Sequence, residues 1–163
     1  MSDVVVVDTS IAVKWVVTEP DTPVALALVA EWNRNGVDLV APALFASEIT
    51  NVLYKRVRKG ELTVAEAGVR LRQVFLAVPA LDFSPDPAVN LALSMRALDL
   101  ARQHGLPATY DAHYLALAER EGCEYWTADE RLWNAVRARL PWVRWLGELS
   151  APAAAPPLPP TAP

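Results

Sequence analysis

Short apolar runs alternate along the chain with longer amphipathic stretches. The clearest run is Val4 to Val7, four consecutive valines that end at Asp8. A continuous β-branched run of this length is typical of a strand buried on both faces, as in a parallel sheet. Further short runs predict strands at residues 38–41, 80–83, 123–127 and 142–146.

Amphipathic helices are predicted between these strands. An apolar stripe through Phe45, Ile49 and Leu53 predicts a helix that begins at Pro42 and ends at Gly60. Strands and helices alternate over most of the chain. We therefore expect an α/β fold of three layers, with a central, mainly parallel sheet of four to five strands and helices on both of its faces.

Three of the predicted helices have caps that can be read from the sequence. Thr63 begins a Thr-Val-Ala-Glu capping box. Asp111 and Asp129 each precede an amphipathic stretch, and both are expected to be N-caps.

The end of the chain is different, because residues 151–163 are rich in proline and alanine and have no periodic apolar face. We expect one domain over residues 1–150 and a flexible tail over residues 151–163.

Composition narrows the class of protein. A hydrophobic fraction of 53% with 21% charged residues is typical of a compact globular chain. The start of the sequence lacks the basic and apolar regions of a secretory signal, and no apolar run is long enough to span a membrane. The single cysteine, Cys123, cannot form an internal disulfide. We expect a cytoplasmic protein with no membrane segment.

The net charge of −4 argues mildly against a nucleic-acid substrate, because proteins that neutralise phosphates with their own side chains are usually basic. This objection weakens if several acids are gathered at one site to hold divalent cations, since bound metal ions then supply the positive charge.

Four acidic residues are candidates for such a site, although each has a simpler explanation. Asp8, Asp111 and Asp129 can each be explained as a helix cap. Glu48 lies at the edge of an apolar helix stripe, where a carboxylate needs a partner, and either Lys55 or a metal ion can fill that role.

The positions of the acids in the predicted fold point to a common site. Asp8 and Asp129 follow two predicted core strands, and ligands of open parallel sheets bind beyond the carboxyl ends of the strands. Convergent carboxylates repel one another unless cations neutralise them, and sites made only of oxygen suit Mg²⁺ or Mn²⁺. Such a site favours phosphodiester chemistry. Asn51 is positioned to orient Glu48 by a hydrogen bond.

Other kinds of site have less support. His104 and His113 lie on predicted helix surfaces without a nucleophile beside them, and no glycine-rich phosphate loop follows the first strand. A haloacid-dehalogenase-type phosphotransferase needs a second acid two residues after Asp8, where this chain has Ser10.

Four sequence blocks resemble the PIN-domain family, and VapC-type toxins in particular. They are Val-Val-Asp-Thr-Ser at 6–10, Pro-x-Leu-x-x-x-Glu-x-x-Asn-Val-Leu at 42–53, Tyr-Asp-Ala-x-Tyr-Leu-Ala-Leu-Ala at 110–118 and Thr-Ala-Asp-x-Arg-Leu at 127–132. Each block alone is weak, but their order and spacing together make the resemblance specific over residues 4–146.

The resemblance implies a PIN-like fold and a Mg²⁺- or Mn²⁺-dependent endoribonuclease. It assigns the catalytic and metal-binding acids as Asp8, Glu48, Asp111 and Asp129, and it assigns Thr127 with Thr9 or Ser10 as supporting hydroxyls. It further implies an RNA substrate, homodimerisation and a cognate antitoxin of a toxin–antitoxin pair. The alternative is a non-catalytic PIN-like module that binds RNA or protein without cutting.

Overall fold

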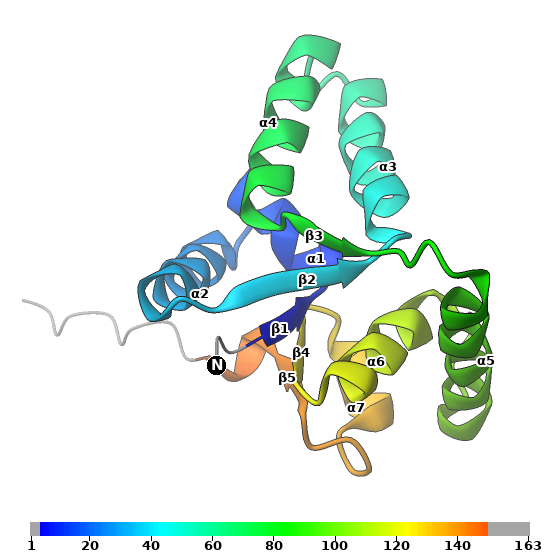
Figure 1. The fold of residues 1–163 in the computed structure, drawn as a ribbon. Coiled ribbons are helices and arrows are strands. Elements are labelled where there is room, and N and C mark those ends of the chain that lie inside the picture. The colour runs from blue at the N-terminus through cyan, green and yellow to red at the C-terminus, as the bar shows by residue number, and fades with distance from the viewer. Residues whose placement is uncertain (1–3, 150–163) are drawn as a thin grey trace, which may run out of the picture.

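The structure, a computed structural model, describes residues 4–149 (Figure 1). Its centre is a five-stranded sheet in which every pairing is parallel, with the order β3-β2-β1-β4-β5. The strands are β1 (Val4–Val7), β2 (Asp38–Pro42), β3 (Ala80–Asp82), β4 (Glu124–Thr127) and β5 (Val143–Trp145). The predicted parallel α/β architecture is therefore confirmed.

Seven α-helices and two short 3₁₀ helices connect and flank these strands in the described part of the chain. They are α1 (Thr9–Ala12), η1 (Val13–Trp15), α2 (Thr22–Asn35), α3 (Phe45–Arg58), α4 (Val64–Ala77), α5 (Pro87–His104), α6 (Tyr110–Glu121), α7 (Glu130–Val136) and η2 (Leu146–Glu148). In Figure 1, α3 and α4 form a hairpin at one end of the molecule, and α5 lies beside α6.

Two neighbouring residues of β4 show that helices cover both faces of the sheet. Trp126 contacts Trp32 of α2, with ring centroids 5.9 Å apart. Tyr125 stacks on Tyr114 of α6, with centroids 5.6 Å apart and an interplanar angle of 22°. Because consecutive side chains of a strand point to opposite faces, α2 and α6 lie on opposite sides of the sheet. The core is thus divided between two helical layers.

The topology places a switch point between β1 and β4. From β1 the chain first extends the sheet through β2 and β3, and it then returns through α5 and α6 to add β4 and β5 on the other side. At such a point the connections on either side of two adjacent parallel strands diverge, which leaves a crevice beyond their carboxyl ends. Asp8 follows β1 at this edge, and Asp129 lies two residues after the end of β4.

Two predicted helix starts are wrong. Pro42 is the last residue of β2, and α3 begins three residues later at Phe45. Helix α6 begins at Tyr110, with Thr109 in the cap position, so Asp111 lies inside the first turn instead of capping the helix. The capping box at Thr63 and the cap at Asp129 are both confirmed.

No helix in the described range, residues 4–149, is both long and apolar enough to cross a membrane.

The proline-rich tail at 151–163 lies outside the described residues, so the prediction about it stands on sequence alone. A variant truncated after residue 150 is expected to melt within a degree or two of the full chain, since the tail has no periodic apolar face to pack. Differential scanning calorimetry of the two proteins measures this. A drop of several degrees would show that the tail docks on the domain.

Candidate active site

The carboxylate of Asp8 is buried at the end of β1 and is held by a dense set of hydrogen bonds. Its Oδ2 accepts hydrogen bonds from Ser10 Oγ at 2.9 Å, Tyr125 OH at 3.1 Å and Thr127 Oγ1 at 2.5 Å. Its Oδ1 accepts a longer bond from the backbone N–H of Ser10, at 3.3 Å, which caps α1. Asp8 is therefore both a helix cap and a fixed carboxylate. Its Oδ2 accepts three hydrogen bonds and its Oδ1 accepts one.

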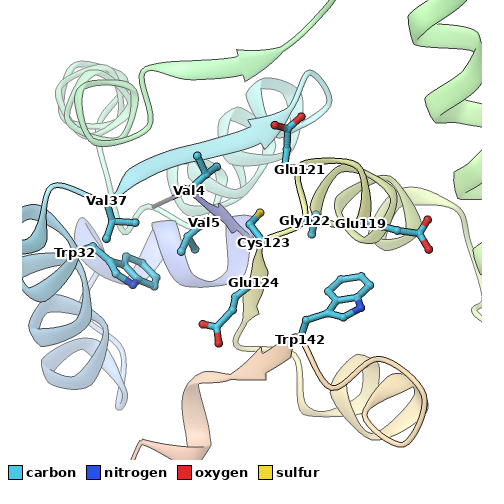
Figure 2. Close-up of a pocket in the computed structure, with 11 residues that line it drawn as sticks. Val4, Val5, Trp32, Val37, Glu119, Glu121, Gly122, Cys123, Glu124 and Trp142 are labelled. Carbon is cyan, nitrogen blue, oxygen red and sulfur yellow. The ribbon is translucent and has the colours of Figure 1, made fainter. Parts of the chain in front are cut away.

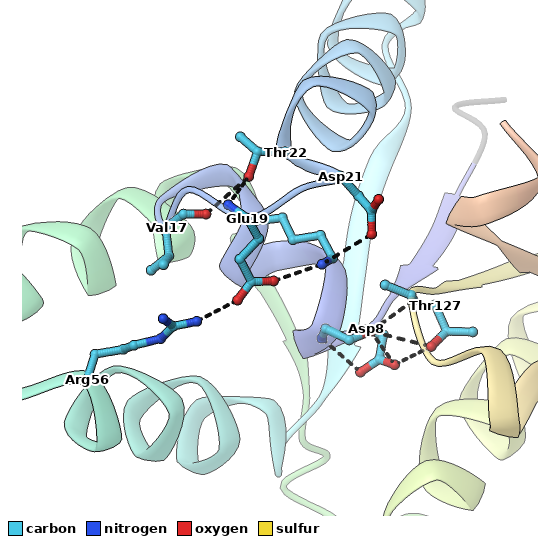
Figure 3. A network of polar contacts seen from close by, with 10 residues as sticks. Asp8, Val17, Glu19, Asp21, Thr22, Arg56 and Thr127 are labelled. Atoms are coloured by element: carbon cyan, nitrogen blue, oxygen red, sulfur yellow. Dashed lines mark hydrogen bonds and ion pairs between the residues drawn. The ribbon is translucent and has the colours of Figure 1, made fainter. Parts of the chain in front are cut away.

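Thr127 joins the ends of β1 and β4. Its hydroxyl donates to Asp8 Oδ2 and accepts the backbone N–H of Asp129 at 3.0 Å (Figure 3). Ser10 adds a second link, because its Oγ accepts the backbone N–H of Ala128 at 2.9 Å. The loop after β4, which carries Asp129, is thus tied directly to the loop after β1.

Glu48 lies one turn into α3 and contacts residues from two other helices. Thr9 donates to its Oε2 at 3.2 Å, and the hydroxyl of Tyr114 on α6 donates to the same oxygen in a short hydrogen bond. Burial raises the pKa of this carboxyl, and the nearby charge of Asp8 raises it further, while the hydrogen bond from Tyr114 opposes both effects. Glu48 is therefore a half-buried acid close to Asp8, and its pKa is raised.

Tyr114 and Tyr125 are site residues that the sequence interpretation missed. Their rings stack, and each hydroxyl donates to one acid, Tyr114 to Glu48 and Tyr125 to Asp8. Burial raises the pKa of both phenols, so they remain neutral hydrogen-bond donors. The signal in the sequence was a tyrosine three residues after Asp111, on the face of a helix that also faces the sheet.

Asp111 has the least conventional environment of the four acids. It is half-buried, it does not cap α6, and no hydrogen bond to its carboxylate is found among the described residues. Burial raises its pKa from 3.8 to about 6, with further contributions from the charges of Asp8, Asp129 and Glu48. This mutual influence shows that the four predicted acids are neighbours in the folded chain.

Asp129 is partly exposed and caps a helix. Its Oδ1 caps α7 by accepting the backbone N–H groups of Arg131 at 2.8 Å and Leu132 at 3.1 Å. No hydrogen bond to its Oδ2 is found within residues 4–149, which leaves one oxygen of this carboxylate available for another ligand.

Two predicted roles are not borne out by the geometry. Asn51 is exposed on α3, and the hydrogen-bond partners of Glu48 among the described residues are Thr9 and Tyr114. The predicted bond from Asn51 is therefore wrong. The histidines are also less solvated than expected: the ring of His104 is half-buried, and His113 packs with its Nδ1 2.8 Å from the carbonyl oxygen of Thr109.

The donor chemistry of the cluster fits a hard divalent cation. All four acids offer oxygen, and Asp111 and Asp129 have carboxylate oxygens without a hydrogen-bond partner in the described region. Within that same region, no group of three His, Cys, Asp or Glu side chains is placed to hold one metal ion together. Mg²⁺ usually keeps several waters and binds through one or two carboxylates, so a closed cage of protein ligands is not required.

Surface hollows flank the acids on two sides. One is lined by Ser10, Lys14, Asp129 and Arg131, and the other by Thr109, Tyr110 and His113 together with the ends of β2 and β3. A larger hollow of about 730 Å³ lies at the opposite edge of the sheet, beside Val4, Trp32 and Trp142 (Figure 2). The glutamates on its rim are paired with arginines, and none of the four acids lines it, so this hollow and the acidic cluster are separate features.

A buried lysine anchors the segment that follows Asp8. Lys14 Nζ lies 2.8 Å from Glu19 Oε2 and 3.6 Å from Asp21 Oδ2, and Arg56 of α3 reaches the other oxygen of Glu19 at 2.6 Å (Figure 3). The network ties η1, the following loop and α3 together. It therefore holds the helix that carries Glu48 against the segment that carries Asp8 and Thr9.

Comparison with known proteins identifies the same fold. The model of the PIN domain family matches residues 5–138. Among solved structures, the chain is similar to PAE2754 from Pyrobaculum aerophilum, with 23% identity, a TM-score of 0.63 and coverage of 91% of this chain and 95% of the other. It is also similar to VapBC2 from Rickettsia felis bound to a DNA fragment from their promoter, with 16% identity, a TM-score of 0.57 and coverage of 86% and 95%. No curated protein sequence matches the chain.

Proposed function

Because the chain belongs to the PIN domain family, we propose that it is a Mg²⁺- or Mn²⁺-dependent endoribonuclease. The proposed catalytic and metal-binding acids are Asp8, Glu48, Asp111 and Asp129. The observation that carries the proposal is Asp111, a half-buried carboxylate that neither caps a helix nor accepts a hydrogen bond from any described residue. A charge left in that position needs a cation, and the charges of Asp8, Asp129 and Glu48 together outweigh that of Arg131 in raising its pKa.

The protein residues in this proposal have separate roles. A bound metal supplies charge neutralisation and an activated water for in-line attack on a phosphodiester. Asp8 is held rigidly by the hydroxyls of Ser10, Tyr125 and Thr127, and this fixes the direction of its less-used Oδ1. Thr9 and Tyr114 orient Glu48 in the same way. Such fixed ligands reduce the reorganisation needed when the metal and the RNA bind.

We further propose that the protein is the toxin of a toxin–antitoxin pair, acts as a homodimer and is blocked by a cognate antitoxin. Two observations support this assignment: the VapC-type sequence blocks that carry the acids, and the similarity of the fold to a VapBC2 structure.

Cleavage of labelled RNA by purified protein tests the proposed function. Cutting is expected with Mg²⁺ or Mn²⁺ and not with chelator, and Glu48→Gln is expected to lose it. The matched control is Glu31→Gln on the exposed surface of α2, which should cut like the parent. RNA that is bound but remains intact with both metals would favour the non-catalytic binding module instead.

Tyr114→Phe is expected to weaken Mn²⁺ binding by roughly tenfold, because residues that orient metal ligands typically contribute that much to affinity. The change removes only the hydroxyl that donates to Glu48 and keeps the ring that stacks on Tyr125. Isothermal titration of Mn²⁺ into the variant measures the effect, with Tyr54→Phe on the exposed face of α3 as the control. Unchanged Mn²⁺ affinity together with a lower melting temperature would limit Tyr114 to a packing role.

A further inference from the structure

The hollow beside Asp111 has an aromatic lining that the catalytic proposal does not use. It has a volume of about 320 Å³ and is lined by residues that include Leu44, Phe83, Asn90, Tyr110 and His113. Phe83 is 71% exposed and Tyr110 is 64% exposed, so both rings present most of their surface to solvent. Large aromatic side chains normally bury most of this area, and two exposed rings at one hollow therefore indicate a ligand surface.

Several residues that line the hollow are close in sequence to the acids. Tyr110 directly precedes Asp111 and is the first residue of α6, and His113 lies one turn further along. Leu44 precedes α3, the helix that carries Glu48. Phe83 follows the last residue of β3, and Asp8 follows the last residue of β1, so both lie at the carboxyl ends of the parallel strands. The hollow and the acid Asp111 therefore share the first turn of α6.

The hollow is also built from a fixed framework. The side chain of Asn90 on α5 accepts the backbone N–H of Ser84 at 3.1 Å and donates to its carbonyl oxygen at 2.7 Å. These bonds fix the turn that follows Phe83. On the other wall, the carbonyl of Thr109 can only accept, so His113 donates through Nδ1 and keeps Nε2 as the remaining polar atom of its ring.

We propose that this hollow is a nucleobase subsite, in which Phe83 and Tyr110 stack on an unpaired base next to the scissile phosphate. The inference rests on the proposed ribonuclease function and specifies the substrate as a single-stranded segment of RNA. Aromatic stacking is how proteins hold unpaired bases, and a base inside a duplex is not accessible to such rings. His113 adds a polar atom in the same hollow, where it can contact the base edge or the ribose.

The test compares RNA binding by ring-removing and ring-keeping variants. A fluorescein-labelled single-stranded oligoribonucleotide of mixed sequence is titrated into Asp8→Asn protein, which is expected to bind without cutting. Adding Tyr110→Ala or Phe83→Ala should raise Kd by about five- to a hundredfold, the range for loss of one base–aromatic stack. Tyr110→Phe should restore most of the affinity. Tyr54→Ala, which removes an exposed tyrosine outside the hollow, should bind like the Asp8→Asn protein.

Two further measurements separate the possible outcomes. In the active protein, Tyr110→Ala should raise KM much more than it lowers kcat, and binding of a duplex RNA should respond far less than binding of the single strand. If the parent cuts RNA but Tyr110→Ala leaves both Kd and KM unchanged, the subsite is wrong while the ribonuclease function stands. If Tyr110→Ala changes the molar mass measured by light scattering, the rings serve a protein interface, and the subsite is likewise wrong. If the parent neither binds nor cuts RNA, both proposals fail.

Discussion

Asp8→Asn is expected to abolish metal-dependent RNA cleavage while the protein stays folded. The amide oxygen of asparagine can keep the three hydroxyl bonds that Asp8 Oδ2 accepts. The amide nitrogen loses only the 3.3 Å cap bond to the backbone of Ser10. That loss costs about 1 kcal/mol, and the removal of one negative charge beside Glu48 and Asp111 offsets it. In chelator the variant should therefore melt close to the parent.

Saturating Mn²⁺ should separate the two proteins. A ligand at a hundredfold its dissociation constant stabilises the folded state by about 2.7 kcal/mol, and the parent should gain this while the variant gains much less. Calorimetric melting with chelator and with Mn²⁺ measures both effects. The matched control is Asp86→Asn, because Asp86 caps α5 outside the acidic cluster and accepts the N–H of Ala88 at 2.9 Å. Equal Mn²⁺ responses of Asp8→Asn and the parent would show that Asp8 is a cap and not a metal ligand.

Acidification of the metal-free protein is expected to relieve the strain at Asp111. Its folded-state pKa is raised from 3.8 to about 6, so between these values the folded chain binds a proton that the unfolded chain does not. The free energy of unfolding contributed by this group therefore rises as pH falls from about 7 towards 4. A shift of this size corresponds to about 3 kcal/mol, and solvent screening of a half-exposed carboxyl reduces the expected gain to roughly 1–2 kcal/mol.

Comparison with Asp111→Asn isolates this effect from the other titrating groups. Several exposed acids, such as Glu61 and Glu66, have lowered pKa values and contribute in the opposite direction, but they are present in both proteins. In chelator at pH 7, Asp111→Asn should be more stable than the parent by urea unfolding, and this advantage should shrink as the pH falls and disappear only below the unfolded-state pKa of 3.8. A difference that stays constant with pH would show that the pKa of Asp111 is not raised.

With Mg²⁺ present, cleavage by the parent should fall as the pH drops below about 6, because the proton competes with the metal for the carboxylate of Asp111.

The strands could be predicted from the sequence because they depend on local patterns. The valines before Asp8 identify a buried parallel strand, and the two acids that follow β1 and β4 meet wherever those strands are adjacent. The helix starts were less certain. Proline is tolerated both in the first turn of a helix and at the end of a strand. In the structure Pro42 is the last residue of β2 and pairs with Asp82 of β3.

The partners of the acids could not be read in the same way, because they are tertiary contacts. Asn51 was expected to orient Glu48, but Asn51 lies on the same helix and is exposed. Tyr114 comes from a helix 66 residues further along the chain. Its role depends on how α6 is rotated against the sheet, and a single sequence does not fix that rotation. The capping role expected of Asp111 failed for a different, local reason, because Thr109 and Asp111 are both suitable N-cap residues and the helix begins at Tyr110.

The strand order also determines when the site can form during synthesis. Asp8 and Glu48 belong to the part of the chain that leaves the ribosome first, whereas Thr127 and Asp129 follow β4, which pairs with β1. A nascent chain that has already built β1, β2 and β3 still lacks half of the acids and the hydroxyl that fixes Asp8. The acidic cluster is therefore incomplete until most of the domain has emerged from the ribosome, and under the proposed function the nascent chain could not cut RNA before that point.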